Sequence, residues 1–413
     1  MDKKERIVFI LGAGFSAPAK LPIQDRILQE MIKKPAEDFL TYTPEPESTK
    51  FLKSFITVGL FLLQNYTAFD CAEYNESFEE LELKSKYTKL DTSVLSEDTE
   101  KNELLILREK IRDSLEKSKI HVSLEDVFTS FDKTYQSREY FHRYSSQYVD
   151  EIKESITRLF VYYFSKRCKN HTYVESDYLS FFSYLKNHAT NSAIISTNWD
   201  VLTETYLEKQ KLVYDLSLND TYYTKDGMVT SKSRKTIKLI KIHGSINWFR
   251  CLNCGKINIV NSENCGNYLF DDKSQETCKS CLITKNADFL LQSQIITPTM
   301  MKSLNSQLYT NLWSSARETL LKADHVYFVG YSLPIADFDF RYLLHQSISD
   351  KAKIDVILYH DDDPKQTKKT NLKDLLPEKR YRDLFAKNDL MFYYNGFGEF
   401  FKSACQKEHL IKK

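Results

Sequence analysis

The chain has 413 residues, of which 42% are hydrophobic and 28% are charged, and its formal net charge is +1. This composition is typical of a globular protein and excludes a largely disordered chain, and the near-zero net charge gives no global attraction to nucleic acid or to an anionic membrane. The sequence contains no run of the ~20 apolar residues that span a bilayer. We therefore expect a cytoplasmic protein with no membrane partner and no direct nucleic-acid partner.

The first apolar segment, IVFILGAGFSA at residues 7–17, has two interpretations. A basic start, an apolar run and small residues resemble a secretory signal, but Asp2 and Glu5 dilute the basic region and no disulfide framework follows. The alternative is a strand followed by a glycine-rich turn and a helix, the pattern that holds a pyrophosphate at a helix N-terminus. By itself this pattern is weak, because many buried strands end in glycine turns.

Five short segments rich in Val and Ile read as strands buried on both faces, as in a parallel sheet. They are residues 6–11, 192–196, 237–242, 325–329 and 354–359. Helical patterns lie between several of them, for example residues 306–323. The alternation predicts an α/β fold with a Rossmann-type, doubly wound parallel sheet.

The region between the first two strands breaks this alternation and reads as mostly helical. We therefore predict a helical insertion over residues 24–190, a small zinc-ribbon module over residues 251–284, and a Rossmann-type domain formed by residues 1–23, 191–250 and 285–413. The last segment, from residue 381 on, predicts a helix, a strand and a short closing helix.

Polar clusters follow three of the strands, where α/β sheets place their ligands. They are Ser196–Asp200, His243–Ser245 and Gly330–Pro334, the last with Asp337 nearby. Each has an ordinary structural explanation: a helix-capping turn, a buried histidine bonded to backbone, and a strand-to-helix turn. The Asp361–Asp363 cluster reads by default as a solvated turn, and its ligand is unknown.

Two C-x-x-C pairs give the most specific local pattern. Cys251 and Cys254 form one pair, and Cys278 and Cys281 form the other, at a spacing near that of a zinc ribbon. Four thiolates bind Zn²⁺ tetrahedrally and leave no open position, so this metal is expected to be structural. Free thiols are the alternative, and Cys265, which lies between the pairs, is a possible replacement for one ligand.

The order of these motifs resembles the sirtuin-like family, in which GAG-x-S, T-x-N-x-D, H-G, two C-x-x-C pairs and G-x-S follow one another. The resemblance covers residues 6–20 and roughly 192–360. It implies an NAD site in which Asn198, His243 and Asp200 are catalytic and His243 is the general base. The cofactor contacts that it implies are Gly12, Ala13, Gly14, Phe15, Ser16, Thr197, Gly330, Ser332, Leu333 and Asp337.

The resemblance implies cleavage of the bond between nicotinamide and ribose. It does not say which nucleophile accepts the ADP-ribosyl group. The peptide-binding segment expected after the zinc site is missing from residues 289–301. Water is then the expected nucleophile, and the expected activity is that of an NAD⁺ glycohydrolase. The resemblance is to the enzymes of this kind that act as NAD-depleting effectors in bacterial antiphage defence. This kind implies a homo-oligomer and a partner such as a HerA-type ATPase. A protein-lysine deacylase and a non-catalytic module that senses NAD or ADP-ribose are the alternatives.

Overall fold

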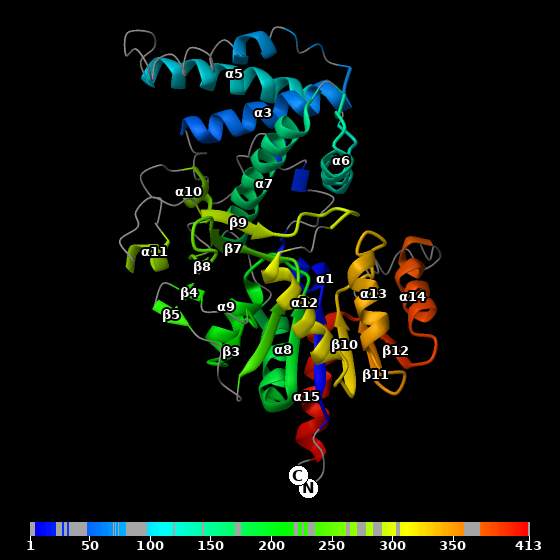
Figure 1. The fold of residues 1–413 in the computed structure, drawn as a ribbon. Coiled ribbons are helices and arrows are strands. Elements are labelled where there is room, and N and C mark those ends of the chain that lie inside the picture. Colours follow the sequence, from blue (N-terminus) through cyan, green and yellow to red (C-terminus); the bar gives the residue numbers. More distant parts are fainter. Residues whose placement is uncertain are drawn as a thin grey trace.

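The computed structural model describes most of the chain and gives three parts, namely a parallel sheet with its flanking helices, a helical lobe and a smaller second sheet (Figure 1). The described residues are 5–21, 27–28, 31–32, 48–68, 70, 72, 74–79, 97–118, 120–142, 144–169, 175–218, 222–224, 227–229, 236–261, 265–270, 278–283, 291–302, 306–358 and 372–411. The Asp361–Asp363 cluster lies outside them.

The central sheet has seven strands in the order β12-β11-β10-β1-β2-β6-β3, and all neighbouring strands are parallel. Its strands are β1 (Ile7–Leu11), β2 (Ser192–Ser196), β3 (Tyr214–Asp215), β6 (Ile237–Lys241), β10 (His325–Val329), β11 (Lys353–Ile357) and β12 (Asp389–Tyr393). The doubly wound α/β prediction is confirmed. The chain order reverses at β1, which lies between β2 and β10, so the ligand crevice of such a sheet is expected above the carboxyl end of β1.

Helices cover both faces of this sheet, as the absence of polar alternation in the strands requires. On one face, α8 (Glu175–Asn187) and α15 (Gly396–Ile411) pack together, and their rings at Phe181 and Phe401 contact Phe9 of β1. The other face carries α12 (Gln307–Leu320), α13 (Phe338–Ser347) and α14 (Leu372–Leu384). The closing helix α15 has 16 residues and is therefore not the short helix that we expected.

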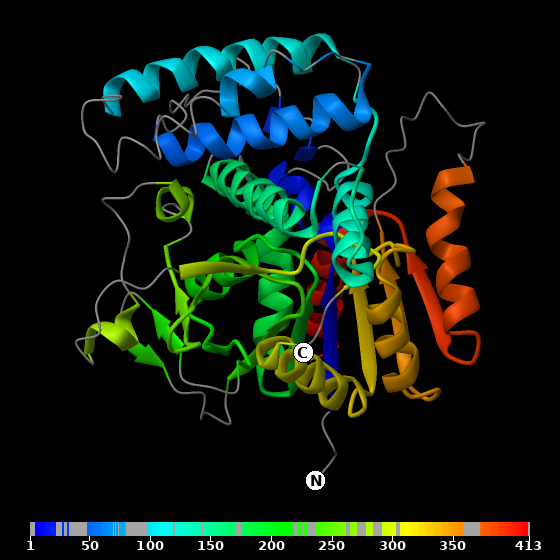
Figure 2. The same ribbon diagram turned by 45° about the horizontal axis from the view of Figure 1, so that its top comes forward.

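The helical lobe lies above the sheet in Figures 1 and 2. Its helices are α3 (Thr49–Tyr66), α5 (Glu97–Lys117), α6 (Leu124–Ser137) and α7 (Ser146–Lys169). Both α5 and α7 pack against α3, whose apolar residues are largely buried. Ser123 caps α6 as expected, because its hydroxyl accepts a hydrogen bond from the Asp126 amide at 3.0 Å.

The second sheet has five strands in the order β5-β4-β8-β7-β9, and Figure 2 shows it beside the central sheet. Its strands are β4 (Tyr222–Thr224), β5 (Gly227–Val229), β7 (Gly244–Cys251), β8 (Ile257–Ile259) and β9 (Leu291–Ile295). Short helices α10 (Cys265–Phe270) and α11 (Lys279–Ile283) accompany it. None of the helices in the described part of the chain is both apolar and long enough for a membrane span.

Candidate functional site

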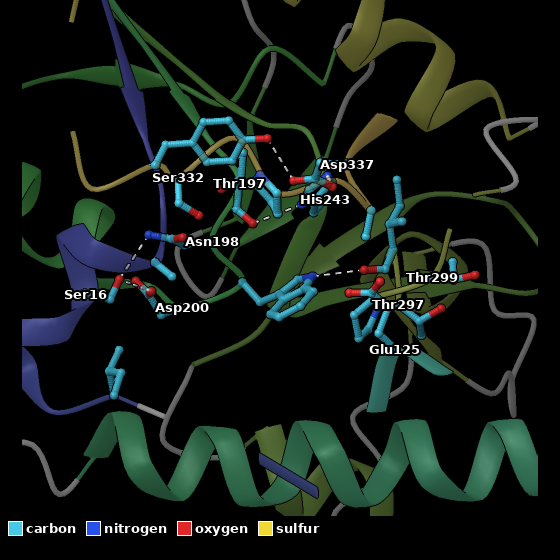
Figure 3. Close-up of a pocket in the computed structure, with 18 of the residues that line it drawn as sticks. Ser16, Glu125, Thr197, Asn198, Asp200, His243, Thr297, Thr299, Ser332 and Asp337 are labelled. Carbon is cyan, nitrogen blue, oxygen red and sulfur yellow. Dashed lines mark hydrogen bonds and ion pairs between the residues drawn. The ribbon is translucent and has the colours of Figure 1, made fainter. Parts of the chain in front are cut away.

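A cavity of about 350 Å³ lies at the carboxyl edge of the central sheet. Four strand ends contribute to its wall: Ala13 and Ser16 follow β1, Thr197–Asp200 follow β2, His243 follows β6, and Gly330–Ser332 follow β10. The structure therefore brings together the polar clusters that the sequence places far apart. Figure 3 shows Asn198 and His243 facing this cavity from neighbouring turns.

A hydrogen-bond network fixes the carboxamide of Asn198. Its Nδ2 donates to the Gly12 carbonyl oxygen at 2.9 Å and to Ser16 Oγ at 3.0 Å, and Ser16 Oγ in turn donates to Asp200 Oδ2 at 2.6 Å. Because both amide protons are used in this way, the Asn198 oxygen is turned toward the cavity (Figure 3). The network thus fixes the Asn198 side-chain oxygen as a hydrogen-bond acceptor in the turn after β2.

Asp200 is held on its other side as well. Its Oδ1 accepts from the Leu202 amide at 2.9 Å, at the start of α9 (Leu202–Lys209). Ser16 is the last residue of the short helix α1 (Ala13–Ser16), so the Ser16–Asp200 bond connects the glycine-rich turn after β1 to the turn after β2.

His243 is buried at the edge of the same cavity. Its Nδ1 lies 3.1 Å from the Thr197 carbonyl oxygen, and since a carbonyl only accepts, Nδ1 carries the proton. Its Nε2 lies 3.4 Å from Asp337 Oδ1. Burial lowers the pKa of His243; Asp337 and the Thr197 carbonyl raise it without offsetting the burial, and Lys302 lowers it further. The ring is therefore neutral at pH 7.

Asp337 has a neighbour at each oxygen. Lys302 Nζ lies 2.8 Å from Oδ1, and the Tyr331 hydroxyl donates to Oδ2 at 3.0 Å. Burial raises the pKa of Asp337, but the electrostatic effects of the nearby His243 ring and of the Lys302 ammonium, together with the hydrogen bonds from Lys302 and Tyr331, outweigh it, so this pKa lies below its ordinary value. Asp337 is thus a buried carboxylate that stays charged.

The glycine-rich turn is packed against the turn after β10. The Gly14 amide donates to the Gly330 carbonyl oxygen at 2.8 Å, and the Gly12 amide donates to the Val329 carbonyl oxygen at 3.0 Å. A Cβ on Gly330, whose φ is +63°, would lie 2.4 Å from the Phe15 nitrogen. The close approach of these two turns shapes the floor of the cavity.

Not all of the expected cofactor contacts have side chains at the cavity. The cavity is lined by Ala13, Ser16, Thr197, Gly330, Ser332 and Asp337, but not by Gly12, Gly14, Phe15 or Leu333. Phe15 and Leu333 are fully buried, and the Phe15 ring packs against Tyr178 and Phe397. The Phe15 and Leu333 side chains therefore belong to the core in this structure and do not line the cavity.

The sequence analysis did not predict several of the residues that line the cavity. Glu125 of α6 and Phe164 of α7 come from the helical lobe, and Thr297, Thr299 and Lys302 follow β9 of the second sheet. None of these residues follows a strand of the parallel sheet, so the rule that located the other polar groups does not apply to them. A second cavity of about 680 Å³ shares Thr297, Thr299 and Lys302 with the first.

The four paired cysteines form a compact cluster at the end of β7 and around α11. Their sulfur atoms all lie within 4.8 Å of one another, with 3.7 Å between Cys251 and Cys281 and 3.5 Å between Cys254 and Cys278. A tetrahedral Zn²⁺ with bonds of about 2.3 Å places its sulfurs about 3.8 Å apart. The donor set therefore fits a structural zinc ion, and all four ligand positions come from the chain.

Cys265 does not belong to this cluster. It is fully buried at the start of α10, and its thiol lies 3.6 Å from the Asn261 carbonyl oxygen. The question that the sequence left open is thus answered by the geometry: the four cysteines of the two C-x-x-C pairs are the ones placed to hold a metal.

Comparison with known protein families finds a match over part of the chain. Residues 192–384 match the SIR2-like domain. The SIR2-like region contains Asn198, His243, the four clustered cysteines and Gly330, whereas β1 and its glycine-rich turn lie outside it. No curated protein sequence matches the chain.

Several solved structures are similar to this chain at low sequence identity. A complex of Sir2 with the inhibitor EX-527, 2'-O-acetyl-ADP-ribose and a deacetylated p53 peptide is 11% identical, with 98% of this chain and 94% of that chain covered and a TM-score of 0.35. A complex of Sir2 with p53 peptide and NAD⁺ has the same identity, coverage and TM-score. A mutant Sir2 homologue bound to ADP-ribose is 13% identical, with the same coverage and a TM-score of 0.36.

Proposed function

We propose that the chain is an NAD⁺ glycohydrolase, which transfers the ADP-ribosyl group of NAD⁺ to water and releases nicotinamide, ADP-ribose and a proton. The observation that carries this proposal is the shared cavity: Asn198, His243 and the turns after β1 and β10 all lie on its wall. The leaving nicotinamide is neutral once the bond breaks, so the reaction needs an orientated acceptor and a base rather than an acid.

The residues divide this work between them. The cavity-facing oxygen of Asn198 is suited to orient a ribose hydroxyl or the attacking water, because the amide is held by Gly12 and Ser16 on its other side. The neutral His243 is suited to accept the released proton at Nε2. Since Nε2 is covered by Asp337, this step requires the ring or the Asp337 side chain to shift when the dinucleotide binds. The zinc site takes no part in the reaction.

The test measures nicotinamide release from NAD⁺ by the purified chain, with and without an acetylated peptide. We expect release without peptide, and we expect Asn198→Ala to lower the rate by about 10²-fold or more. Asn311→Ala on α12, outside the cavity, is the matched control and should retain the activity. Full turnover by the Asn198→Ala protein would remove the assignment.

A lysine deacylase is the second candidate, and the larger cavity is the observation that favours it. That cavity borders β9, an edge strand of the second sheet, and shares lining residues with the smaller cavity. Nicotinamide release that depends on the acetylated peptide would support this alternative. Tight NAD binding without any product would instead support a sensing module.

We also propose, from the resemblance of the sequence motifs, that the chain acts as an NAD-depleting effector in antiphage defence, as a homo-oligomer regulated by a HerA-type ATPase. The same assay addresses this proposal when it is run with the chain alone and with such an ATPase. Activity that changes on assembly is the expected result, and equal activity in both samples would argue against regulation by this partner.

A further inference from the structure

The Nε2 side of His243 faces a buried ion pair. Asp337 is only 8% exposed, and its Oδ1 lies 3.4 Å from His243 Nε2 and 2.8 Å from Lys302 Nζ. Lys302 also donates to the Ala336 carbonyl oxygen at 3.0 Å, which fixes the ammonium beside the start of α13. One carboxylate oxygen thus lies between the imidazole and the ammonium.

Both oxygens of Asp337 already interact with neighbouring side chains. Its Oδ1 accepts from the Lys302 ammonium and its Oδ2 accepts from the Tyr331 hydroxyl, so each oxygen already has a donor within the protein. These two bonds hold the negative charge of Asp337 in place beside the His243 ring, where it acts on the imidazole through its field.

We propose that Asp337 and Lys302 are positioning residues that act through His243, with the carboxylate stabilising the ring once it has accepted a proton and the ammonium opposing that protonation beforehand. This inference rests on the proposed function, in which His243 is the general base of the hydrolysis. The proton comes from the attacking water and ends on His243 Nε2, while the bonding electrons of the cleaved bond leave with nicotinamide.

The other charged groups around the ring are placed so that this pair dominates. Asp200, from the turn after β2, directs its carboxylate to Ser16 and to the Leu202 amide. Glu125, from α6, lines the same cavity but is not among the groups that shift the His243 pKa. The facing charges are Lys302, from the loop after β9, and Asp337, which immediately precedes α13.

The physical consequence is a pair of opposite effects on one imidazole. A carboxylate near the ring favours imidazolium and an ammonium disfavours it, by about 1 to 3 pH units for an unscreened charge at 4–6 Å. Removing Asp337 should therefore lower the protonation midpoint of His243, and removing Lys302 should raise it. A role in folding alone predicts no such opposition.

The experiment follows the His243 ring by NMR titration of the full-length protein labelled with ¹⁵N-histidine, and His243→Gln identifies the signal. We expect Asp337→Asn to lower the midpoint by about one unit or more, Lys302→Met to raise it by a similar amount, and the double variant to lie between them. Asp339→Asn, the same change on the first turn of α13, is the control and should leave the midpoint in place.

The pH profile of kcat/KM for NAD⁺ gives the second readout. Because the base must be deprotonated, the acid limb should follow the midpoint, to lower pH in Asp337→Asn and to higher pH in Lys302→Met. Lys302→Met tests the proposal independently if Asp337→Asn fails to fold, and Lys302→Arg should restore the wild-type midpoint.

Midpoints that stay within about 0.3 unit, roughly a third of the smallest expected shift, or that move in the same direction would overturn the proposal. Failure of the proposed function and failure of the positioning roles give different results. Opposite midpoint shifts without any NAD hydrolysis would refute the glycohydrolase while leaving the electrostatic assignment intact. Hydrolysis with unshifted midpoints would refute the positioning roles alone.

Discussion

At the scale of single residues, the site depends on how closely two turns approach each other. Gly330 adopts φ +63°, and its backbone lies against Gly14 and Phe15. The turn after β10 can contact the glycine-rich turn after β1 only because neither Gly14 nor Gly330 carries a Cβ. This contact sets the position of Ser332 and of the start of α13 relative to the cavity.

We expect Gly330→Ala to cost several kcal/mol of unfolding free energy, because it adds a left-handed backbone strain of about 1 kcal/mol and a clash with the backbone of the facing turn. Gly255→Ala is the matched control. Gly255 has φ +72°, but the nearest atom to its added Cβ is 3.6 Å away on the Arg250 side chain. Thermal and urea unfolding measure both losses, and similar losses in the two variants would contradict the close-contact explanation.

At the scale of elements, a buried lysine joins the turn after β2 to the turn after β6. Lys241, at the end of β6, is 1% exposed, and its ammonium donates to the Asp200 carbonyl oxygen, to Glu204 Oε1 at 2.8 Å and to Ser245 Oγ at 2.7 Å. Burial raises the pKa of Glu204, against the opposing effect of Lys241. The ion pair thus lies behind the segments that carry Asn198 and His243.

Lys241→Met is expected to cost about 3–5 kcal/mol of stability, because it leaves the Glu204 carboxylate buried without its cation. The loss should grow from pH 5 to pH 8. Burial raises the pKa of Glu204 in the folded state, so the folded protein becomes less stable as pH rises and this carboxyl group ionises. Adding Glu204→Leu removes the lone charge and should recover more than half of the loss. Urea titration measures each step.

Lys238→Met provides the control on the same strand. Lys238 is exposed, so its replacement should change stability by no more than about 0.5 kcal/mol. A Lys241→Met protein as stable as the Lys238→Met protein would show that the buried pair does not hold the two turns together.

At the scale of the whole molecule, the cavity is assembled by all three parts of the fold. The central sheet provides the polar strand ends, the helical lobe provides Glu125 and Phe164, and the loop after β9 provides Thr297, Thr299 and Lys302. The cysteine cluster lies at the end of β7, the loop that lines the cavity follows β9, and these two strands pair in the second sheet. We therefore expect metal binding to stabilise the cavity indirectly.

The purified protein should contain about one zinc ion per chain. Cys278→Ser is expected to lose the metal and to lower the melting temperature, because one of four ligands is removed. Cys265→Ser, which changes a buried cysteine outside the cluster, should retain it. Elemental analysis checks both variants, and metal retained in Cys278→Ser but lost in Cys265→Ser would show that Cys265 is a ligand.

The residue pattern was enough to predict the parallel sheet, most of its strands and the polar ends of four of them, whereas β3 and the second sheet were not predicted. The predicted features are local: a run of buried β-branched residues forms a strand, and parallel strands bring their carboxyl ends to one edge. The expectation that Ser16, Asn198, His243 and Gly330 share one site came from the resemblance of the motif order, and the spacing of the C-x-x-C pairs predicted that the four cysteines converge.

Only the tertiary structure decided which groups complete the site. Lys302 meets Asp337 because the loop after β9 folds back over the sheet, and Glu125 reaches the cavity because the helical lobe covers it. It also showed that the Phe15 side chain belongs to the core and that Cys265 lies outside the metal cluster. The physical reason is common to these cases: contacts between separate elements depend on how their surfaces pack, and no periodicity or spacing within one segment encodes that.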